Sequence, residues 1–146
     1  MVSATNLLSS ELTDAISGKD ISAALSLIEL SKNKDSSIDI NQSNGSEDDF
    51  TPLMLACIQQ LFDIVTILLD HPGIEVNLQN KNGISAFMLA AGSGNAEIVT
   101  QFLRHKSTNL ALQDNEGHTA LWWGENSKND QVITLLKSHS RWCCLI

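Results

Sequence analysis

Three histidines recur along the chain at the regular spacing that a set of metal ligands could have. His71, His105 and His139 follow one another at intervals of 34 residues. Zinc requires imidazole ligands at about 2.0–2.1 Å, whereas equivalent residues of stacked helices lie about 8–10 Å apart. The equal spacing therefore argues against one shared metal ion, and no other metal-ligand spacing is present. We expect instead that each histidine follows a helix and interacts with its terminal carbonyl groups.

The three cysteines offer little catalytic chemistry. Cys57 lies in an apolar stretch and is expected to be an inert core residue. Cys143 and His139 could form a nucleophile–base pair, but the sequence gives this pair no orienting acid and no oxyanion hole. No phosphate-binding glycine loop or serine elbow is present either. We therefore predict that the chain is not an enzyme and uses no metal and no cofactor.

The end of the sequence carries a possible lipidation signal. Cys143-Cys144-Leu145-Ile146 matches the C-a-a-X motif, in which the cysteine thiolate takes a prenyl chain from a prenyltransferase. A terminal Leu or Phe favours geranylgeranyl, and Ile146 is most similar to these. The alternative is that Trp142, Leu145 and Ile146 fold back over the preceding helix.

Composition narrows the possible partners. With 146 residues and a net charge of −8, the chain fits one domain that can bury a core. The negative charge argues against nucleic-acid binding and against adhesion of the whole body to an anionic membrane. No apolar run is long enough for a membrane span, and the first residues do not resemble a signal peptide. We therefore expect a cytoplasmic protein.

An internal repeat of 34 residues organises the chain. Thr51, Ser85 and Thr119 follow one another at this interval, and each is predicted to cap a short helix; Pro52 occupies the first helical position. A second helix with apolar residues at helical spacing follows. Neither helix can bury its apolar face alone, so the units must stack. The repeated apolar columns are Leu53, Phe87 and Leu121; Ile64, Ile98 and Val132; Val65, Val99 and Ile133; and Leu68, Phe102 and Leu136.

The repeat resembles the ankyrin family. The segment TPLMLA at 51–56 is similar to the ankyrin signature T-P-L-H-x-A, and NKNGIS and DNEGHT resemble the β-turn of an ankyrin unit, with Gly83 and Gly117 at its tight position. A fainter copy, which aligns Ala15 with Ala56, precedes them. The resemblance implies an all-α ankyrin-repeat solenoid of stacked helix-turn-helix units with β-turn or hairpin-like loops. It covers 1–146 as a single domain with approximate repeats 8–43, 44–79, 80–113 and 114–140, followed by a tail at 141–146.

Two departures from the family pattern affect the expected stability. Met54, Met88 and Trp122 replace the signature histidine, which in the family joins adjacent turns by hydrogen bonds. Stability should then depend more on packing. Trp123 and Gly124 replace Leu and Ala in the last unit, and a glycine inside a helix costs about 1 kcal/mol relative to alanine. We expect the last unit to be the least regular.

The resemblance also implies where a partner protein binds. Ankyrin proteins bind other proteins at the turn tips and along the exposed side of the first helices. Phe50, Ile58 and Ile84 are candidate anchors because an apolar residue among polar ones can dock a partner, although each could equally complete the packing of a turn. The candidate binding residues are Asp48, Asp49, Phe50, Ile58, Gln59, Lys81, Asn82, Ile84, Ser93, Asn115, Glu116, His118, Asn126 and Ser127.

These features lead to one main functional hypothesis. The chain is predicted to be a monomeric adaptor that binds a protein on its concave surface, while prenylated Cys143 holds it on cytosolic membrane faces. One lipid chain gives reversible attachment, so residence at the membrane should be reinforced by the partner. Such a module also resembles effectors that bacteria deliver into host cells, where host membranes would hold it. The alternative is a soluble, unlipidated inhibitor of an enzyme such as a kinase, because cyclin-dependent kinase inhibitors are similar in size and repeat number.

Overall fold

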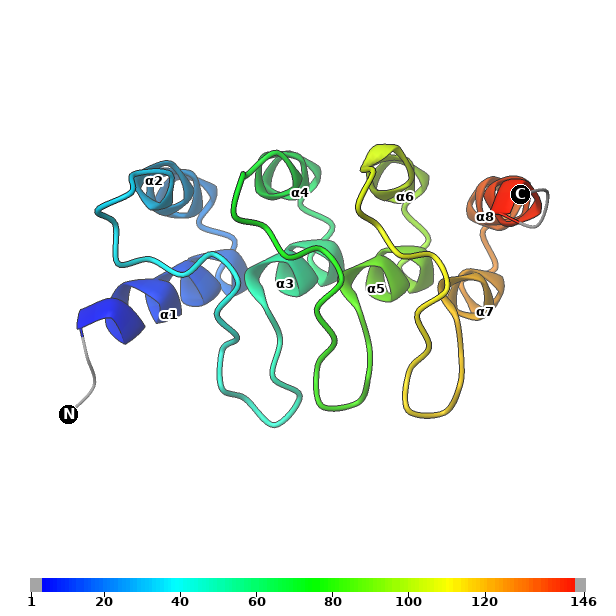
Figure 1. Cartoon of the computed structure of the whole chain (residues 1–146), viewed down its shortest axis with the longest axis horizontal. Helices are drawn as coiled ribbons and strands as arrows, with labels where there is room; N and C mark the ends of the chain where they lie inside the picture. Colours follow the sequence, from blue (N-terminus) through cyan, green and yellow to red (C-terminus); the bar gives the residue numbers. More distant parts are fainter. Residues whose placement is uncertain (1–3, 144–146) are drawn as a thin grey trace. The chain divides into compact units, whose positions relative to one another are not determined.

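The computed structural model describes residues 4–143, and the side chains of 7–140. These residues form eight α-helices joined by turns, with one isolated β-bridge and no sheet among them (Figure 1). The predicted all-α ankyrin-repeat fold is confirmed. The chain divides into unit 1, which ends at Glu75, and unit 2, which begins at Val76. Unit 1 contains α1 (Ala4–Ser17), α2 (Ile21–Ser31), α3 (Pro52–Ile58) and α4 (Phe62–Leu69), and unit 2 contains α5 (Ala86–Gly92), α6 (Ala96–Arg104), α7 (Ala120–Asn126) and α8 (Asp130–Cys143).

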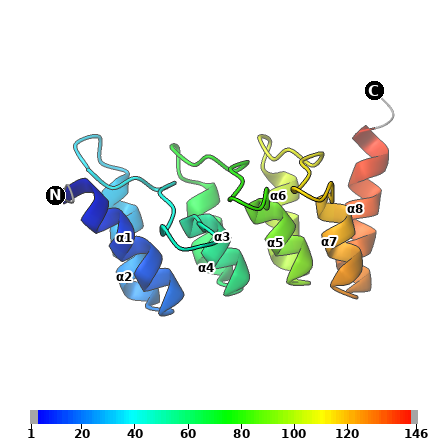
Figure 2. The ribbon, with the colours of Figure 1, turned by 90° about the horizontal axis from the view of Figure 1, so that it is seen from below.

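Unit 1 consists of two helix pairs that bury one core. Within this unit α1 and α3 form one layer and α2 and α4 form the other (Figure 1). Figure 2 shows the two helices of each pair running alongside one another. Leu12 and Ile16 of α1, Ile28 of α2, and Ile64 and Leu68 of α4 are fully buried. Each helix therefore contributes its apolar face to a core that no single pair could form.

Unit 2 follows the same plan, with α5 and α7 in one layer and α6 and α8 in the other. The ring centroids of Phe87 and Phe102 lie 5.6 Å apart, and Val132 of α8 is also fully buried in the core of the unit. The predicted apolar columns are buried in this unit except at Leu121 and Ile133, which are partly exposed. The periodic positions thus identified about half of the buried apolar residues of unit 2 and all of its largest ones except Met88.

The starts of the first helices confirm two of three predicted caps. The hydroxyl oxygens of Thr51 and Ser85 each accept a hydrogen bond at 3.3 Å, from the amides of Met54 and Met88 respectively. Thr119 has the same extended backbone before α7, but its hydroxyl makes no capping bond. Thr119 therefore stands at the predicted N-cap position, but the predicted side-chain bond is absent.

The turn between the two helices of each repeat contains one residue with a left-handed backbone. The φ angle is +57° at Lys19, Gln60 and Lys128, and +72° at Gly94. Because the same position recurs in all four repeats, α1 and α2 form a repeat of the same plan, as the faint sequence alignment predicted. Only Gly94 adopts this conformation without a Cβ penalty.

The predicted β-turns of unit 2 are confirmed at Gly83 and Gly117, whose φ angles are +75° and +84°. Their amides donate to the carbonyls of Asn80 at 2.9 Å and of Asp114 at 3.0 Å. A Cβ on Gly83 would lie 2.6 Å from Oδ1 of Asn115, whereas no atom lies within 4 Å of a Cβ on Gly117. Gly83 is therefore required both for its own turn and for the close approach of the next one.

Side-chain amides join the loops of successive repeats within each unit. In unit 1, Asn41 donates to the carbonyl of Gly73 at 2.8 Å and accepts from the amide of Glu75 at 2.9 Å. In unit 2, Asn77 makes the corresponding pair of bonds at 2.7 and 2.8 Å. These bonds provide a connection between loops that the missing signature histidine cannot make.

The unusual Trp123-Gly124 pair adapts α7 to its neighbours. Gly124 is buried, and a Cβ there would lie 2.5 Å from Cδ1 of Leu136 on α8. Trp123 lies against Gly92 of α5, where a Cβ would lie 2.9 Å from the indole ring. The glycines thus admit side chains that alanine would crowd, and this closer packing compensates for their low helix propensity.

Candidate protein-binding site

His71 is a structural residue that joins α2 to the end of α4. Its Nε2 lies 3.1 Å from the hydroxyl of Ser31, and its Nδ1 accepts from the amide of Gly73 at 3.0 Å. Burial and the positive charge of Lys32 lower the pKa of His71 and outweigh a bond with Ser31 that raises it. The imidazole is therefore held neutral, with Nδ1 as the acceptor.

The other two histidines have different surroundings. His105 is the C-cap of α6, so it follows a helix as predicted. Its backbone amide donates to the carbonyl of Gln101, whereas Nδ1 of its imidazole is buried without a hydrogen-bond partner in the described part of the chain. The prediction that His139 follows a helix is wrong, because α8 continues to Cys143. Its Nδ1 lies 3.0 Å from the carbonyl of Leu135, one turn earlier in the same helix. Among the described residues no group of three or more His, Cys, Asp or Glu could hold a metal ion.

The cysteines divide into a core residue and residues of the chain end. Cys57 is fully buried, and burial strongly raises the pKa of its thiol, so it stays protonated and unreactive, as predicted. Cys143 is the last residue of α8, while its side chain and residues 144–146 lie outside the described part. None of the helices in the described part is both long enough and apolar enough to cross a bilayer.

In unit 1 the predicted binding residues lie in a turn and at the end of α3. Asn44 organises the turn, because its Oδ1 accepts from the amide of Phe50 at 3.1 Å. Phe50 is half-buried, whereas Ile58 at the end of α3 is 40% exposed. Ile58 is therefore better placed than Phe50 to meet a partner. The predicted residues of unit 1 are Asp48, Asp49 and Phe50 in the turn, with Ile58 and Gln59 at the end of α3.

In unit 2 the structure brings five predicted residues together around a cavity of about 330 Å³. Its wall comes from the turns around Gly83 and Gly117 and from the start of α7. The cavity is small, so it suits one side chain of a partner and not a whole ligand. The five predicted residues are Asn82, Ile84, Asn115, Glu116 and His118, and they are joined in the wall by Asp114, Trp122 and Trp123.

Asp114 fixes three of the residues that line this cavity through hydrogen bonds. Its Oδ1 accepts from the amides of Glu116 at 3.0 Å and His118 at 2.9 Å, and its Oδ2 accepts from the indole N–H of Trp123 at 3.0 Å. Burial raises the pKa of Asp114, but these hydrogen bonds together with the nearby His118 outweigh that effect and lower it. The carboxylate is therefore ionised and structural.

Trp122 forms the aromatic wall of the cavity and is 41% exposed. The ring of His118 stacks on its indole, with centroids 3.6 Å apart and planes 14° from parallel, and Trp123 meets it edge-on at 6.0 Å. His118 also lies 3.6 Å from the carboxylate of the exposed Glu116. These contacts fix the orientation of Trp122 while leaving part of its surface open.

Sequence reasoning did not identify Trp122 as a binding residue. The sequence pattern marks it only as a replacement for the signature histidine, like Met54 and Met88. Those two methionines are fully or almost fully buried, whereas Trp122 is not. A change from a flexible to a large aromatic side chain in one repeat was the available signal, because tryptophan is enriched at the energetic centres of interfaces.

The remaining predicted residues of unit 2 lie outside the cavity wall. Lys81 belongs to the turn around Gly83, where its carbonyl accepts a hydrogen bond from the side chain of Asn115 at 2.9 Å. Ser93 and Ser127 are the C-caps of α5 and α7, and Asn126 is the last residue of α7. These three positions complete helix ends and do not share the cavity.

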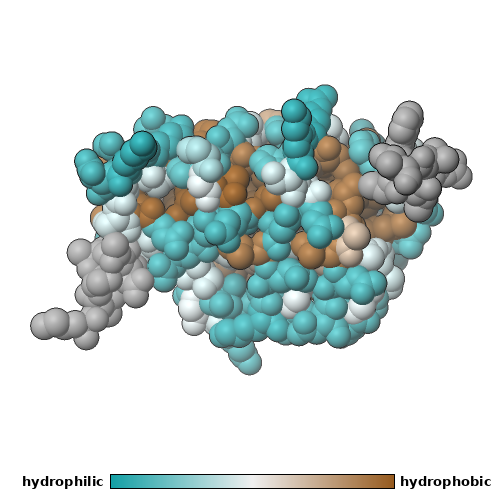
Figure 3. Space-filling view, viewed as in Figure 1, coloured by the Kyte–Doolittle hydropathy of each residue, from teal (hydrophilic) through white to brown (hydrophobic). Residues whose placement is uncertain are grey.

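The arrangement favours recognition of a protein side chain. On the face drawn in Figure 3, hydrophobic side chains gather over the helices of each unit, and hydrophilic ones cover the turns. The cavity of unit 2 combines both kinds, because Trp122 and Glu116 both line it. An aromatic surface and a carboxylate in one cavity can bind an apolar or cationic group of a partner.

Comparison with known proteins identifies the repeats. A family model described as ankyrin repeats in three copies matches residues 72–142, and a model of a single ankyrin repeat matches residues 48–81. A search of curated proteins found no match. Across residues 48–142 the chain therefore belongs to the ankyrin-repeat family.

Proposed function

We propose that the chain is a non-enzymatic adaptor that binds a partner protein through the Trp122 cavity of unit 2. The observation that carries this proposal is the exposed indole, held by stacking on His118 in a cavity that Glu116 also lines. Ankyrin repeats are interaction modules, and a fixed, partly exposed tryptophan beside a small cavity is the kind of residue that supplies most of an interface's affinity. The partner's side chain would enter the cavity without any rearrangement of the turns.

Quantitative affinity purification tests this function. Wild-type protein, a Trp122→Ser variant and a Leu7→Ser variant would be compared as baits. Leu7 is a suitable control because it is 58% exposed and lies on α1 in unit 1. Partners should be lost from Trp122→Ser and kept by Leu7→Ser. Loss from both, or from neither, would argue against the cavity as the binding site.

We also propose that the chain is held on cytosolic membrane faces by a prenyl group on Cys143. The support is the C-a-a-X match of Cys143-Cys144-Leu145-Ile146, which acts only where Ile146 bears the free carboxylate. Because α8 continues to Cys143, the transferase would have to unwind its last turn to obtain an extended tail. Host enzymes would add the lipid if the protein acts as a bacterial effector.

Mass spectrometry of protein made in eukaryotic cells tests this lipidation. The modified protein should have lost three residues and gained one isoprenoid, and it should sediment with membranes. Cys143→Ser should release it, while Cys144→Ser should remain lipidated because that residue is removed with the last two. Unmodified, full-length protein in the soluble fraction would contradict the proposal and favour a soluble inhibitor.

A further inference from the structure

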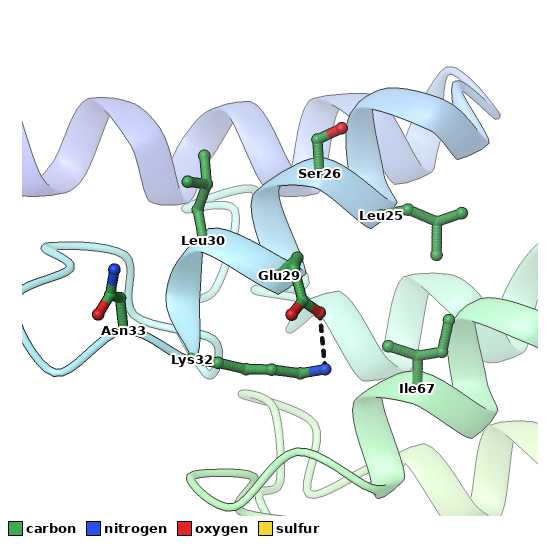
Figure 4. Close-up of a pocket in the computed structure, with 7 residues that line it drawn as sticks. All are labelled: Leu25, Ser26, Glu29, Leu30, Lys32, Asn33 and Ile67. Atoms are coloured by element: carbon green, nitrogen blue, oxygen red, sulfur yellow. Dashed lines mark hydrogen bonds and ion pairs between the residues drawn. The ribbon is translucent and has the colours of Figure 1, made fainter.

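Unit 1 contains a second surface, made of other residues than the Trp122 cavity. Between α2 and α4 lies an open groove of about 980 Å³, with Leu25 and Leu30 on α2 and Ile67 on α4 among its lining residues. Figure 4 shows Leu25 and Ile67 extending from the two helices at the gap between them. Leu25 is 36% exposed and Leu30 is 57% exposed. The groove thus presents apolar side chains that the core of unit 1 does not use.

Comparison of the repeats shows that an apolar residue at Leu25 is not demanded by the fold. Counted from the residue before each second helix, Leu25 corresponds to Thr66, Thr100 and Thr134. The core side of α2 is formed by other residues, which include the fully buried Ile28. Leu25 therefore lies on the solvent side of its helix, at a position where the other three repeats have a threonine.

One carboxylate, that of Glu29, lines the groove of unit 1, and a second, that of Asp63, lies one helical turn from a lining residue. Glu29 lies one turn after Leu25 on α2, and Asp63 lies one turn before Ile67 on α4. The position of Glu29 is taken by Arg104 in α6 of unit 2. Glu29 and Asp63 thus place negative charge near the apolar side chains of unit 1. In unit 2 the position equivalent to Glu29 carries the positive charge of Arg104 instead.

The charge of the whole chain is concentrated in the same unit. Residues 1–75 hold three lysines and twelve Asp or Glu residues, a net charge of −9. Residues 76–146 hold six Lys or Arg and five Asp or Glu residues, a net charge of +1. A basic partner is attracted to unit 1, while an anionic lipid surface and a second copy of unit 1 are repelled.

One cation already lies at the groove, and it is weakly held. Lys32 pairs with Glu29 at 2.8 Å, with side-chain exposures of 40% and 75%. An exposed pair of this kind contributes little to stability. A cation of a partner could therefore replace Lys32 at Glu29 with little loss to the fold.

We propose that the groove between α2 and α4 binds an amphipathic α-helix of a partner protein that is rich in lysine or arginine. The apolar face of the helix lies on Leu25, Leu30 and Ile67, and its basic side chains meet Glu29 and Asp63 at the rim. This mode of recognition needs an apolar groove and an anchor every three or four residues of the bound helix. The surface supplies the apolar groove and the acidic charge, and the partner helix would supply the anchors.

The test uses the full chain and two synthetic probes. One peptide is an amphipathic helix of leucine and lysine, and the other has the same pattern with glutamate in place of lysine. At physiological salt, where charges are screened beyond about 8 Å, the lysine peptide should bind and the glutamate peptide should not. Amide chemical-shift changes should be confined to 21–33 and 62–70.

Variants that carry residues from the other repeats distinguish binding in the groove from general electrostatic attraction to the acidic unit 1. The double variant Leu25→Thr, Ile67→Ser places residues that occupy the same columns elsewhere in the chain, so it should fold normally. It should bind the lysine peptide about tenfold more weakly. Leu7→Thr is the matched control, because Leu7 is a 58% exposed leucine of α1 and the charge is unchanged. It should bind as the wild type does.

Four outcomes would overturn the proposal. The lysine peptide could fail to bind, or the glutamate peptide could bind equally well. The double variant could also retain full affinity for the lysine peptide, with chemical-shift changes spread over the acidic turn at 46–50. Self-association of the chain that the double variant abolishes would make a second copy the occupant instead.

Discussion

Unit 1 and unit 2 have the same arrangement of two helix pairs but differ in what they expose. Unit 1 carries a net charge of −9 and exposes aliphatic side chains between its second helices, whereas unit 2 carries +1 and holds every tryptophan of the chain. The buried columns are similar in both units. The repeat plan thus fixes the core and leaves the exposed columns free to acquire different binding chemistry.

The turns of the two units also differ. In unit 1 the turn around Gly45 is longer than its counterparts, and no atom lies within 4 Å of a Cβ built on Gly45. In unit 2 the turn at Gly83 is in close contact with Asn115 of the next turn. Sequence length alone distinguishes the turns, but only the contacts show that one pair is tightly joined. Four predictions examine this difference.

The largest effect is expected from Gly83→Ala. A left-handed alanine costs about 1–2 kcal/mol, and crowding against Asn115 adds about 1–3 kcal/mol, so unit 2 should lose about 3 kcal/mol. Gly45→Ala in unit 1, with a φ of +64° and free space, should lose only about 1 kcal/mol. Urea denaturation followed by tryptophan fluorescence reports on unit 2, and circular dichroism reports on both. Equal losses would show that the turn contact in unit 2 is unimportant.

Asp114→Asn should destabilise unit 2 by about 2 kcal/mol, because an amide group placed against the indole N–H of Trp123 leaves a buried donor unpaired. The folded pKa of Asp114 is lowered, so its contribution is present above the unfolded pKa and is lost as pH falls through the folded pKa. The variant should lack that loss. Asn44→Asp, in the exposed turn of unit 1, should change stability by less than about 0.5 kcal/mol, and a larger change would remove the contrast between the two turns.

His71 should give unit 1 a pH dependence. Its folded pKa lies below the usual value of 6.5, so the folded state takes up a proton less readily than the unfolded state. Its contribution is complete above pH 6.5 and declines as pH falls below that value. Urea denaturation followed by circular dichroism at pH 7.5 and pH 5.5 should show this decline in the wild type and a smaller one in His71→Asn. An unchanged decline would assign it to other groups.

The smallest effect is expected at the turns between paired helices. Gln60→Gly in unit 1 and Lys128→Gly in unit 2 should each stabilise the protein by about 0.5–1 kcal/mol, because both residues have a φ of +57°. Gly94→Ala should destabilise by about 1 kcal/mol for the same reason. Thermal unfolding measured by calorimetry distinguishes these signs. A loss of stability in Gln60→Gly alone would indicate that its side chain is used in unit 1.

Local sequence signals predicted the fold where the interaction partners are near in the chain. The caps at Thr51 and Ser85 and the turn at Gly83 involve residues three or four positions away. The prediction for His139 was wrong because α8 continues beyond it to Cys143, and no glycine or proline after His139 marks an earlier end. The side-chain bond predicted at Thr119 is absent because the residue type permits the bond without ensuring its geometry.

The candidate sites were predicted only in part. The turn positions predicted five residues of the unit 2 cavity. They did not predict Trp122, because its exposure depends on what surrounds α7. The sequence did not predict the groove of unit 1, because Leu25 and Ile67 lie far apart in the chain. Both are apolar residues that a buried core would equally accept. Exposure is a property of the assembled repeats and is not encoded in residue type.

The sequence by itself determined the repeat period, the helical units, the buried columns and the excess of negative charge, since each of these is a property of residue type and spacing. Tertiary structure alone decided that Trp122 stacks on His118, that Gly124 admits Leu136, and that Leu25 faces a groove. The physical reason is that packing and solvent exposure arise from contacts between repeats, and those contacts join residues that the linear pattern treats as independent.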